Sequence, residues 1–241
     1  MNFSPQLAAN QVHVWQISLT TPEHSASDLS EDELERAQRF HFENDRLRFI
    51  AARSALRNIL SPYLNLPPSE VAFSYTPKGK PELAAHLHQP ALQFNLSHSG
   101  DFALLALALN ARVGADIELV DPERATDAIA ARFFSPTETA ALRALPSAER
   151  TTAFFQCWTR KEAYVKALGE GLTLPLASFD VAFGPGVPPA LLRIEGSSNE
   201  VSRWSFYHIP APLGYAAAVA VEGRQPALIF RKWNDQVPHQ P

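Results

Sequence analysis

The chain has 241 residues and a single cysteine, Cys157, so no intramolecular disulfide can form. One thiol fits a reducing compartment. Cys157 lies beside Trp158 with no histidine at motif spacing, which indicates a small packed side chain and not a nucleophile. The N-terminus also lacks a basic stretch followed by an apolar core, so a signal peptide is not expected. These absences favour a cytoplasmic protein.

Long apolar runs and a surplus of basic residues are missing as well. The longest runs, FALLALAL at 102–109 and YAAAVAV at 215–221, are too short to cross a bilayer and are typical of buried strands. The chain has 21 basic and 25 acidic residues, a net charge of −4, whereas general nucleic-acid binders are normally basic. Membrane and nucleic-acid partners are therefore both disfavoured.

Hydrophobic residues make up 46% of the chain, enough to bury a substantial core. The periodicity predicts an α+β fold of two α/β halves, a subdomain at 1–111 and another at 112–223, followed by a tail at 224–241 with little pattern. Strands are expected at 12–19, 71–75, 92–96, 102–108, 112–120, 178–183, 190–195, 201–209 and 214–221. Helices are expected at about 30–60, from Ser135, and at 147–168.

The most informative segment is FFQCWTRKEAYVKALGEGL, because a carboxylate lies where a buried side chain is expected. Read as a helix, it places Glu162 inside an apolar stripe, between Phe155 and Val165. Lys161 and Lys166 are expected at the two edges of that stripe. An unpaired carboxylate facing a core costs several kcal/mol or more. Glu162 therefore needs a cation, a donor network or a raised pKa.

The expected partner of Glu162 is the strand RVGADIELV at 112–120. Asp116 and Glu118 alternate with apolar residues and so project from one face, about 7 Å apart along the strand. Together with Glu162 they form a set of three carboxylates, the hard oxygen donors that Mg²⁺ prefers. This set predicts metal-assisted chemistry on a phosphate ester or a pyrophosphate.

Each of these signals also has a structural explanation. A D-x-E strand is usually a solvated sheet face. Glu162 and Lys166, four residues apart, match a common surface ion pair on a helix. The apolar surroundings of Glu162 favour the metal-site interpretation.

The first half of the chain carries two candidate phosphate-binding segments and one arginine. In YTPKGKPEL, the residues Lys78, Gly79, Lys80 and Pro81 combine two point charges with a glycine that allows close backbone approach. The alternative is a turn that happens to carry lysines. Arg53 lies in the apolar run FIAARSAL, so we expect its guanidinium to meet a specific anion.

The second candidate segment is QFNLSHSG, at the end of a predicted strand. It carries Asn95, Ser97 and His98, and the histidine beside two hydroxyl groups could donate to a phosphate oxygen. A lone histidine is more often a structural residue, and this alternative stays open.

Four motifs together resemble one known family. G-x-D-x-E at 114–118, W-x-x-K-E-A-x-x-K at 158–166, KGKP at 78–81 and FNLSHSG at 94–100 look like those of the 4'-phosphopantetheinyl transferases. The match is to the large, pseudo-dimeric Sfp-like type and runs from about residue 30 to 221. The resemblance implies two similar α/β subdomains in one chain, usually a monomer. One departure is Ala115, where a branched aliphatic residue is usual. Because Ala115 points to the other strand face, we expect no loss of metal binding.

The resemblance also implies a reaction and its site residues. Such enzymes move the 4'-phosphopantetheine arm of coenzyme A onto a serine of an apo acyl, peptidyl or aryl carrier protein, and release adenosine 3',5'-bisphosphate. The matching positions are Asp116, Glu118 and Glu162 for Mg²⁺ (Mn²⁺ being possible), Lys166 for the pyrophosphate and the leaving phosphate, and Lys78, Gly79, Lys80, Pro81, Asn95, Leu96, Ser97 and His98 for coenzyme A. Arg53 matches a residue at the 3'-phosphate, with Arg48 as the less favoured substitute. The general base is either Glu162 itself or a metal-bound water.

Carrier proteins of this kind are typically acidic, so the segment at 122–134, with Arg124 and Arg132, is the expected contact. Two other functions stay open. A Mg²⁺-dependent nucleotide-pyrophosphate hydrolase would need no carrier protein. A non-catalytic coenzyme A-binding module would have no reason to keep three carboxylates.

Overall fold

The computed structural model describes residues 5–21, 24–87, 91–169, 171–197 and 199–233, except for the side chain of residue 172. The chain forms two compact units. The N-terminal unit comprises the residues up to Asn110 together with those from Leu228 on, and the C-terminal unit comprises Ala111–Ala227.

The N-terminal unit is built on a four-stranded sheet in the order β11-β1-β5-β4, in which β5 runs antiparallel to both β1 and β4. A separate two-stranded hairpin consists of β2 and β3. The elements are β1 (Gln11–Ser18), α1 (Glu31–Gln38), α2 (Glu43–Leu64), β2 (Phe73–Tyr75), β3 (Pro81–Leu83), β4 (Leu92–Ser99), β5 (Phe102–Leu109) and β11 (Ala227–Lys232), with 3₁₀-helices at Ala26–Asp28, Pro68–Glu70 and Ala85–Leu87.

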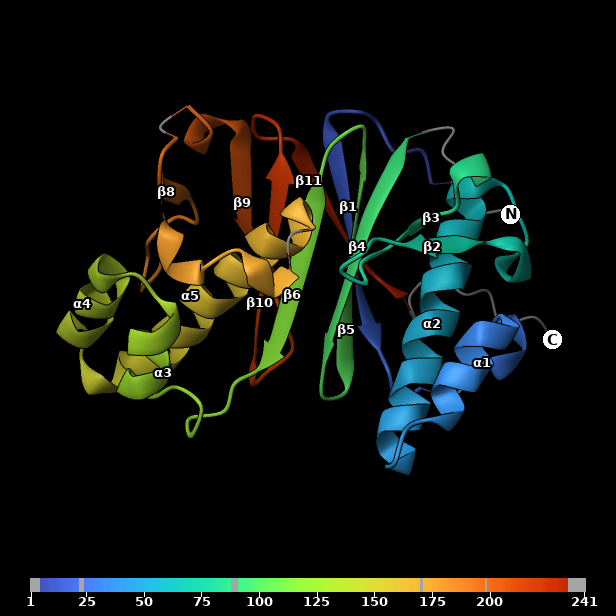
Figure 1. Ribbon diagram of the computed structural model, residues 1–241, viewed down its shortest axis with the longest axis horizontal. Coiled ribbons are helices and arrows are strands. Elements are labelled where there is room, and N and C mark those ends of the chain that lie inside the picture. The colour runs from blue at the N-terminus through green and yellow to red at the C-terminus, as the bar shows by residue number, and fades with distance from the viewer. Residues whose placement is uncertain (1–4, 22–23, 88–90, 170, 198, 234–241) are drawn as a thin grey trace. The chain divides into compact units, whose positions relative to one another are not determined.

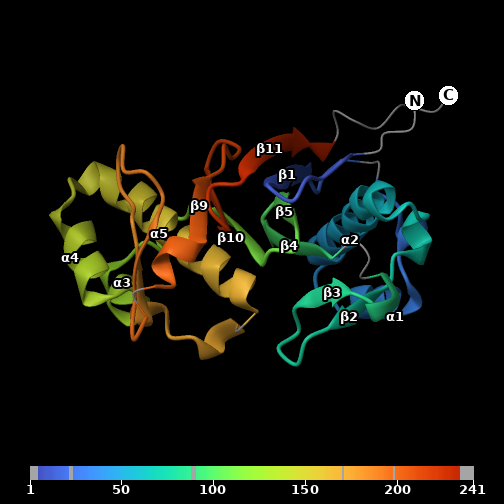
Figure 2. The same cartoon turned by 90° about the horizontal axis from the view of Figure 1, so that it is seen from above.

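Helix α2 lies across one face of this sheet (Figures 1 and 2). Its alanines and its Leu56 and Ile59 pack on Trp15 of β1, Leu105 of β5 and Phe94 of β4. The small residues let the helix backbone approach the sheet, while the larger ones fill the space between them. The helix ends at Asn65, whose left-handed backbone (φ 54°) stops it before two prolines.

The C-terminal unit repeats this plan with a three-stranded antiparallel sheet, β6-β10-β9, and a second pair, β7-β8. Its long helix α5 has 22 residues, as α2 does. The elements are β6 (Val113–Leu119), α3 (Asp127–Phe133), α4 (Pro136–Ala144), α5 (Ser147–Leu168), β7 (Phe179–Val181), β8 (Leu191–Ile194), β9 (Trp204–His208) and β10 (Tyr215–Glu222), with 3₁₀-helices at Gly171–Thr173, Leu176–Ser178 and Val201–Arg203.

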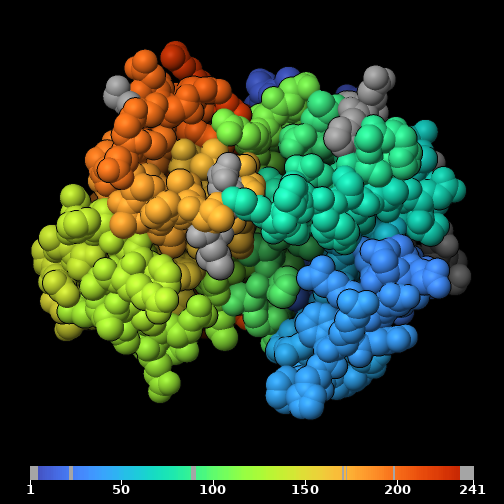
Figure 3. Space-filling view, in the orientation of Figure 1, coloured from blue at the N-terminus to red at the C-terminus, as the bar shows by residue number. Residues whose placement is uncertain are grey.

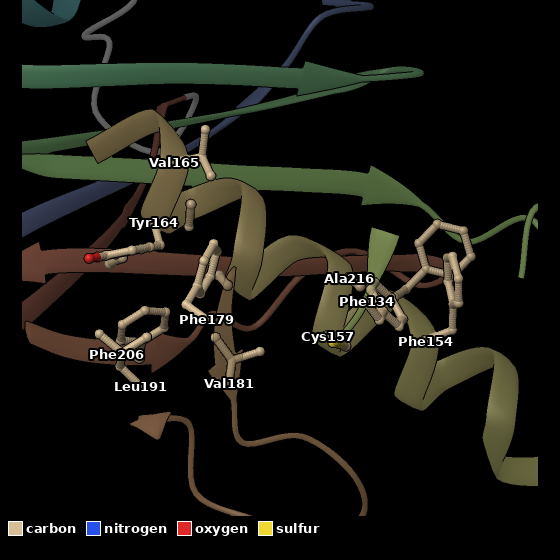
Figure 4. Close-up of a cluster of buried hydrophobic side chains, with 14 of the residues drawn as sticks. Phe134, Phe154, Cys157, Tyr164, Val165, Phe179, Val181, Leu191, Phe206 and Ala216 are labelled. Atoms are coloured by element: carbon tan, nitrogen blue, oxygen red, sulfur yellow. The ribbon is translucent and has the colours of Figure 1, made fainter. Parts of the chain in front are cut away.

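Aromatic side chains fill the core of the C-terminal unit. Phe154 and Tyr164 of α5 pack with Phe134, Phe179 and Phe206 from other elements (Figure 4). Cys157 is buried in the same core, as its sequence context predicts. The core fixes α5 against β10 and β7, and so sets which of its faces turns toward β6.

The predicted α+β class is confirmed. The bounds predicted for the long helix agree with α5, which begins after Pro146 and ends at Gly169 in a left-handed conformation (φ 73°). Helix α4 begins after Ser135, as predicted, with a capping box in which Ser135 and Glu138 each bond the other's backbone. No helix among the described residues is both long and apolar enough to cross a membrane.

The prediction of a patternless tail at 224–241 is wrong for its first part. Residues Ala227–Lys232 form β11, an edge strand next to β1. The pairing joins opposite ends of the chain, and a six-residue strand with a proline before it gives little local signal. Residues 234–241 lie outside the described part of the chain.

A buried histidine lies in the N-terminal unit. His13 is 1% exposed, and its Nδ1 is 2.6 Å from the hydroxyl oxygen of Tyr63, which also accepts a hydrogen bond from Trp15 Nε1 at 3.2 Å. Burial, together with the positive charge of Arg231, lowers the pKa of His13 to about 4. The folded protein therefore holds this imidazole neutral.

We predict that acid destabilises the protein through His13. Because the pKa is lower in the folded state, the unfolded chain binds the proton first, so stability falls as the pH drops from 6.5 toward 4. At about pH 5 the loss due to His13 should be about 2 kcal/mol. Urea unfolding at about pH 7.5 and pH 5 measures it, with His13→Gln as the control that lacks this titration. An equal acid loss in the variant would contradict the assignment.

Candidate active site

Strand β6 meets helix α5 at Gly114. A Cβ atom at Gly114 would lie 2.0 Å from the carbonyl oxygen of Ala163 and 2.4 Å from the backbone nitrogen of Ala167. Real Cβ contacts are not this short, so no other residue fits unless the helix moves. Across the sheet, Gly114 pairs with Ala220, and Asp116 pairs with Ala218. The small alanine side chains leave room for a helix to approach this face of the sheet. The backbone of α5 therefore rests directly on β6.

This contact brings the predicted site residues of the C-terminal unit together. Glu162 and Lys166 each precede one of the two alanines that meet Gly114, and Asp116 follows Gly114 by two residues on the same strand face. Lys166 Nζ donates to Asp116 Oδ1 at 2.5 Å. Asp116 is buried, whereas Glu118 and Glu162 are partly exposed. Glu118 Oε2 lies 3.7 Å from Arg124 Nη1.

The electrostatics of the cluster show that its charges act on one another. Burial raises the pKa of Glu162, repulsion from Asp116 and Glu118 raises it further, and Lys166 partly opposes the rise. For Lys166, burial disfavours the charged form, but attraction and hydrogen bonding to Asp116, with Glu162 and Glu118 adding to it, raise the pKa. The three carboxylates thus share one electrostatic site, with an ammonium group among them.

The carboxylate oxygens of Asp116, Glu118 and Glu162 are donors that suit a hard divalent cation, but the three side chains do not converge on one point. Within the described ranges, no group of three or more histidine, cysteine, aspartate or glutamate side chains has an arrangement that could hold a metal ion. Lys166 takes the place of a cation at Asp116. When no ion is bound between carboxylates that can hold Mg²⁺, they repel one another, and burial together with this repulsion raises the pKa of at least one of them, as it does for Glu162. Metal binding by Asp116, Glu118 and Glu162 stays a prediction.

The prediction that Lys161 lies at the edge of the site is wrong. Its side chain is fully buried, on another side of α5 from Lys166. Lys161 Nζ donates to Glu138 Oε2 at 2.8 Å and to the carbonyl oxygens of Leu176 and Phe179 at 2.8 Å and 2.5 Å. This ion pair fastens α4 and the segment before β7 to α5. Losing one partner of such a pair costs roughly 3–5 kcal/mol.

The KGKP segment forms the tip of the β2-β3 hairpin in the N-terminal unit. Gly79 N donates to the carbonyl oxygen of Thr76 at 2.8 Å, and Gly79 has a φ of +81° that other residues rarely adopt. Lys78 is exposed at the turn, and Pro81 begins β3 opposite Tyr75. The stretch that contains this hairpin, coloured teal in Figure 3, lies at the surface of its unit. Lys80, on the other side of Gly79, is partly buried, and a role of this turn in coenzyme binding stays a prediction.

The NLSH segment lies within a strand and not in a loop, and coenzyme binding by its residues stays a prediction. Asn95, Ser97 and His98 all lie within β4, paired with β5. Asn95 and Ser97 are buried on one strand face, and His98 is exposed on the other. Because the two strand faces point in opposite directions, a bound ligand would contact either Asn95 and Ser97 or His98 more readily than all three.

Arg53 meets an anion from the chain itself. Its Nε donates to Glu33 Oε1 at 2.5 Å, and Arg57 Nε donates to Glu33 Oε2 at 2.7 Å, all three groups being buried. Burial opposes the charge of Glu33, but the two arginines and the Ser30 N–H hold its pKa below the usual value. Glu33 also accepts from the Ser30 backbone N–H at 3.0 Å, so one carboxylate caps α1 and holds two arginines.

The same arginines anchor the hairpin that carries KGKP. The guanidinium groups of Arg53 and Arg57 lie 4.5 Å and 5.2 Å from the ring centroid of Phe73 in β2, and Arg53 Nη2 lies 3.4 Å from the Tyr75 hydroxyl oxygen. Arg48, the substitute, donates to Asp101 at 2.7 Å. Arg53 and Arg48 thus each contact groups of the chain itself, and a role of either at the 3'-phosphate stays a prediction.

Comparison with known proteins places the chain in a family. Residues 112–220 match the model of the 4'-phosphopantetheinyl transferase superfamily, and residues 13–110 match that of the N-terminal part of 4'-phosphopantetheinyl transferases. The chain is 39% identical to 4'-phosphopantetheinyl transferase HetI of Nostoc sp. strain PCC 7120, over 90% of each chain. It is 35% identical to 4'-phosphopantetheinyl transferase Sfp of Bacillus subtilis strain 168, over 66% of this chain and 68% of that one. The protein belongs to the 4'-phosphopantetheinyl transferase family.

Among solved structures, the chain resembles the holo-[acyl-carrier-protein] synthase of Thermotoga maritima with a TM-score of 0.38. The two are 22% identical, over 46% of this chain and 62% of that one. A resemblance at this level supports no conclusion about the site. The family assignment depends on the sequence matches.

We predict that Gly114→Ala displaces α5 from β6. The added methyl group would meet backbone atoms, which cannot rotate away. Overpacking of this kind costs about 1–3 kcal/mol or more, and the pair between Asp116 and Lys166 should separate. The free energy of unfolding, measured in urea, and the carrier-loading activity should both fall. Gly186→Ala is the matched control, because nothing lies within 4 Å of its Cβ and only its positive φ of +70° opposes alanine. A Gly114→Ala protein with unchanged stability and activity would contradict the close contact.

Proposed function

We propose that this protein transfers 4'-phosphopantetheine from coenzyme A to a serine hydroxyl group of an apo carrier protein, with Mg²⁺, giving holo carrier protein and adenosine 3',5'-bisphosphate. The observation that carries the proposal is the cluster of Asp116, Glu118, Glu162 and Lys166, held together on β6 and α5 in a member of this family. A cytoplasmic location and a monomeric state are predictions from the sequence.

The products of the proposed reaction define which bond of coenzyme A breaks. Because the leaving bisphosphate keeps its 5'-phosphate, the serine oxygen bonds to the distal phosphorus and the bond from that phosphorus to the bridging oxygen breaks. Lys166, whose raised pKa keeps it protonated, would neutralise charge on the leaving phosphate. Glu162, a partly exposed carboxylate of the cluster, would accept the serine proton directly or through a water molecule.

The residues present suit the metal that this reaction uses. Asp116, Glu118 and Glu162 would hold Mg²⁺ through carboxylate oxygens once Lys166 leaves Asp116. When bound, the ion would neutralise negative charge on the diphosphate. In the N-terminal unit, the exposed hairpin tip with Lys78 and Lys80 would meet coenzyme A phosphates.

Carrier loading tests the proposal directly. The protein is incubated with coenzyme A, Mg²⁺ and a panel of apo carrier proteins, and intact mass shows whether a carrier gains the phosphopantetheine arm. Glu162→Gln and Asp116→Asn should each lower kcat/KM by about a hundred-fold or more. Glu149→Gln, in the first turn of the same helix, is the matched control and should stay active. Release of phosphopantetheine without a modified carrier would instead indicate a hydrolase. If coenzyme A is not consumed, the protein would be a binding module.

We also propose that the carrier protein docks on helix α3. Arg132 is exposed in its last turn and could meet an acidic partner. Arg124, the other predicted contact, lies 3.7 Å from Glu118, so changing it would also disturb the site. Arg132 is therefore the cleaner probe of docking.

Reversing the charge of Arg132 should weaken carrier binding alone. We predict that Arg132→Glu raises the KM for the carrier protein several-fold, by the roughly 1 kcal/mol typical of a rim charge, and leaves the KM for coenzyme A unchanged. Arg224→Glu, an exposed arginine of the same unit beyond β10, is the control. An unchanged KM for every carrier that the enzyme modifies would refute docking through this arginine.

A further inference from the structure

We propose that Lys166 competes with the divalent cation for Asp116, so that coenzyme A must draw this lysine away before the metal binds tightly. Metal loading is thereby coupled to arrival of the coenzyme. The inference rests on the proposed function for the identity of the diphosphate, but the competition itself depends only on residues of the C-terminal unit.

The competition follows from the geometry of the ion pair. Lys166 Nζ lies 2.5 Å from Asp116 Oδ1, while Mg²⁺ binds carboxylate oxygen at about 2.0–2.1 Å. An ammonium group and a divalent ion at these distances from one oxygen would repel each other strongly in a partly buried site. Occupation of Asp116 Oδ1 by one therefore disfavours binding of the other at the same oxygen.

The two partners differ in their freedom to move. The Asp116 side chain is 2% exposed and lies on a paired strand, whereas the Lys166 side chain is 31% exposed at the end of a flexible four-carbon stem. Asp116 is a fixed ligand, and Lys166 can exchange its carboxylate partner for another anion. A diphosphate is such an anion, because a lysine ammonium binds phosphate as a point charge.

The charge balance gives the direction of the coupling. The three carboxylates Asp116, Glu118 and Glu162 already have two cationic side chains beside them, Lys166 at Asp116 and Arg124 at Glu118. The carboxylates then attract a second cation only weakly. When Lys166 turns to a diphosphate, their attraction for a divalent ion rises. By reciprocity, the ion strengthens coenzyme binding by the same factor.

Mn²⁺ binding without coenzyme A tests the competition independently of activity. Free Mn²⁺ is followed by its electron paramagnetic resonance signal, at one fixed pH for all variants. We expect Lys166→Met to bind Mn²⁺ at least about ten-fold more tightly than the wild type. Lys166→Arg, which keeps the charge, should stay close to the wild type. Lys232→Met removes the same charge from an exposed position of the N-terminal unit and should change nothing.

Addition of coenzyme A tests the coupling. After correction for Mn²⁺ bound by coenzyme A alone, the coenzyme should tighten Mn²⁺ binding more in the wild type than in Lys166→Met. Should Lys166→Met fold poorly, as judged by circular dichroism, Lys166→Gln provides the same comparison. Mn²⁺ affinity in the neutral variant that equals or falls below that of the wild type would overturn the proposal.

Failure of this inference and failure of the proposed function give different results. Carrier modification by the wild type, with equal Mn²⁺ affinities in the wild type and Lys166→Met, would refute the competition alone. A wild type that shows the predicted Mn²⁺ behaviour but modifies no carrier would refute the transferase function and leave the competition standing.

Discussion

The contact between helix α5 and strand β6 at Gly114 is the constraint on which the site depends. It allows two backbones to meet where a side chain would normally keep them apart. Glu162 and Lys166 lie next to the contact on the helix, and Asp116 lies next to it on the strand. A longer side chain at position 114 would move the helix away, and the same carboxylates would no longer share one electrostatic environment.

Two kinds of ion pair have different roles in this fold. Lys161 with Glu138, and Glu33 with Arg53 and Arg57, are buried and hydrogen-bonded on several sides, so they fasten elements together. Such pairs are costly to break, because the remaining charge stays buried. The pair between Lys166 and Asp116 is open to solvent on the lysine side and can exchange partners. The first kind suits a scaffold, and the second suits a site that must bind and release ions.

The local features of the site could be predicted from the sequence. Helix α5 has the bounds 147–168 that the sequence predicts, and alternation along β6 fixes which residues share a face with Asp116. Glu162 drew attention because it interrupts an apolar stripe, and the structure gives it a raised pKa, one of the three outcomes that this position required. These features are local, because each depends on the spacing of residues within one element.

The features that could not be predicted depend on contacts between distant segments. Lys161 was expected at an edge of the apolar stripe, but its partner Glu138 lies on α4. Arg53 was expected to meet a ligand, but its partner Glu33 lies on α1. One carboxylate can both cap a helix and hold a distant cation, which a local pattern does not show. Strand β11 was missed because its neighbour β1 lies at the other end of the chain.

The central claim is that carboxylates from β6 and α5 meet around one divalent ion. Anomalous diffraction at the manganese edge, from crystals grown with Mn²⁺ and coenzyme A, tests it most directly. We expect a single strong peak within coordination distance of oxygens from Asp116, Glu118 and Glu162, with Lys166 Nζ moved from Asp116 to a phosphate oxygen. A fully occupied peak that lacks Glu162 or Asp116 as a ligand would contradict the account.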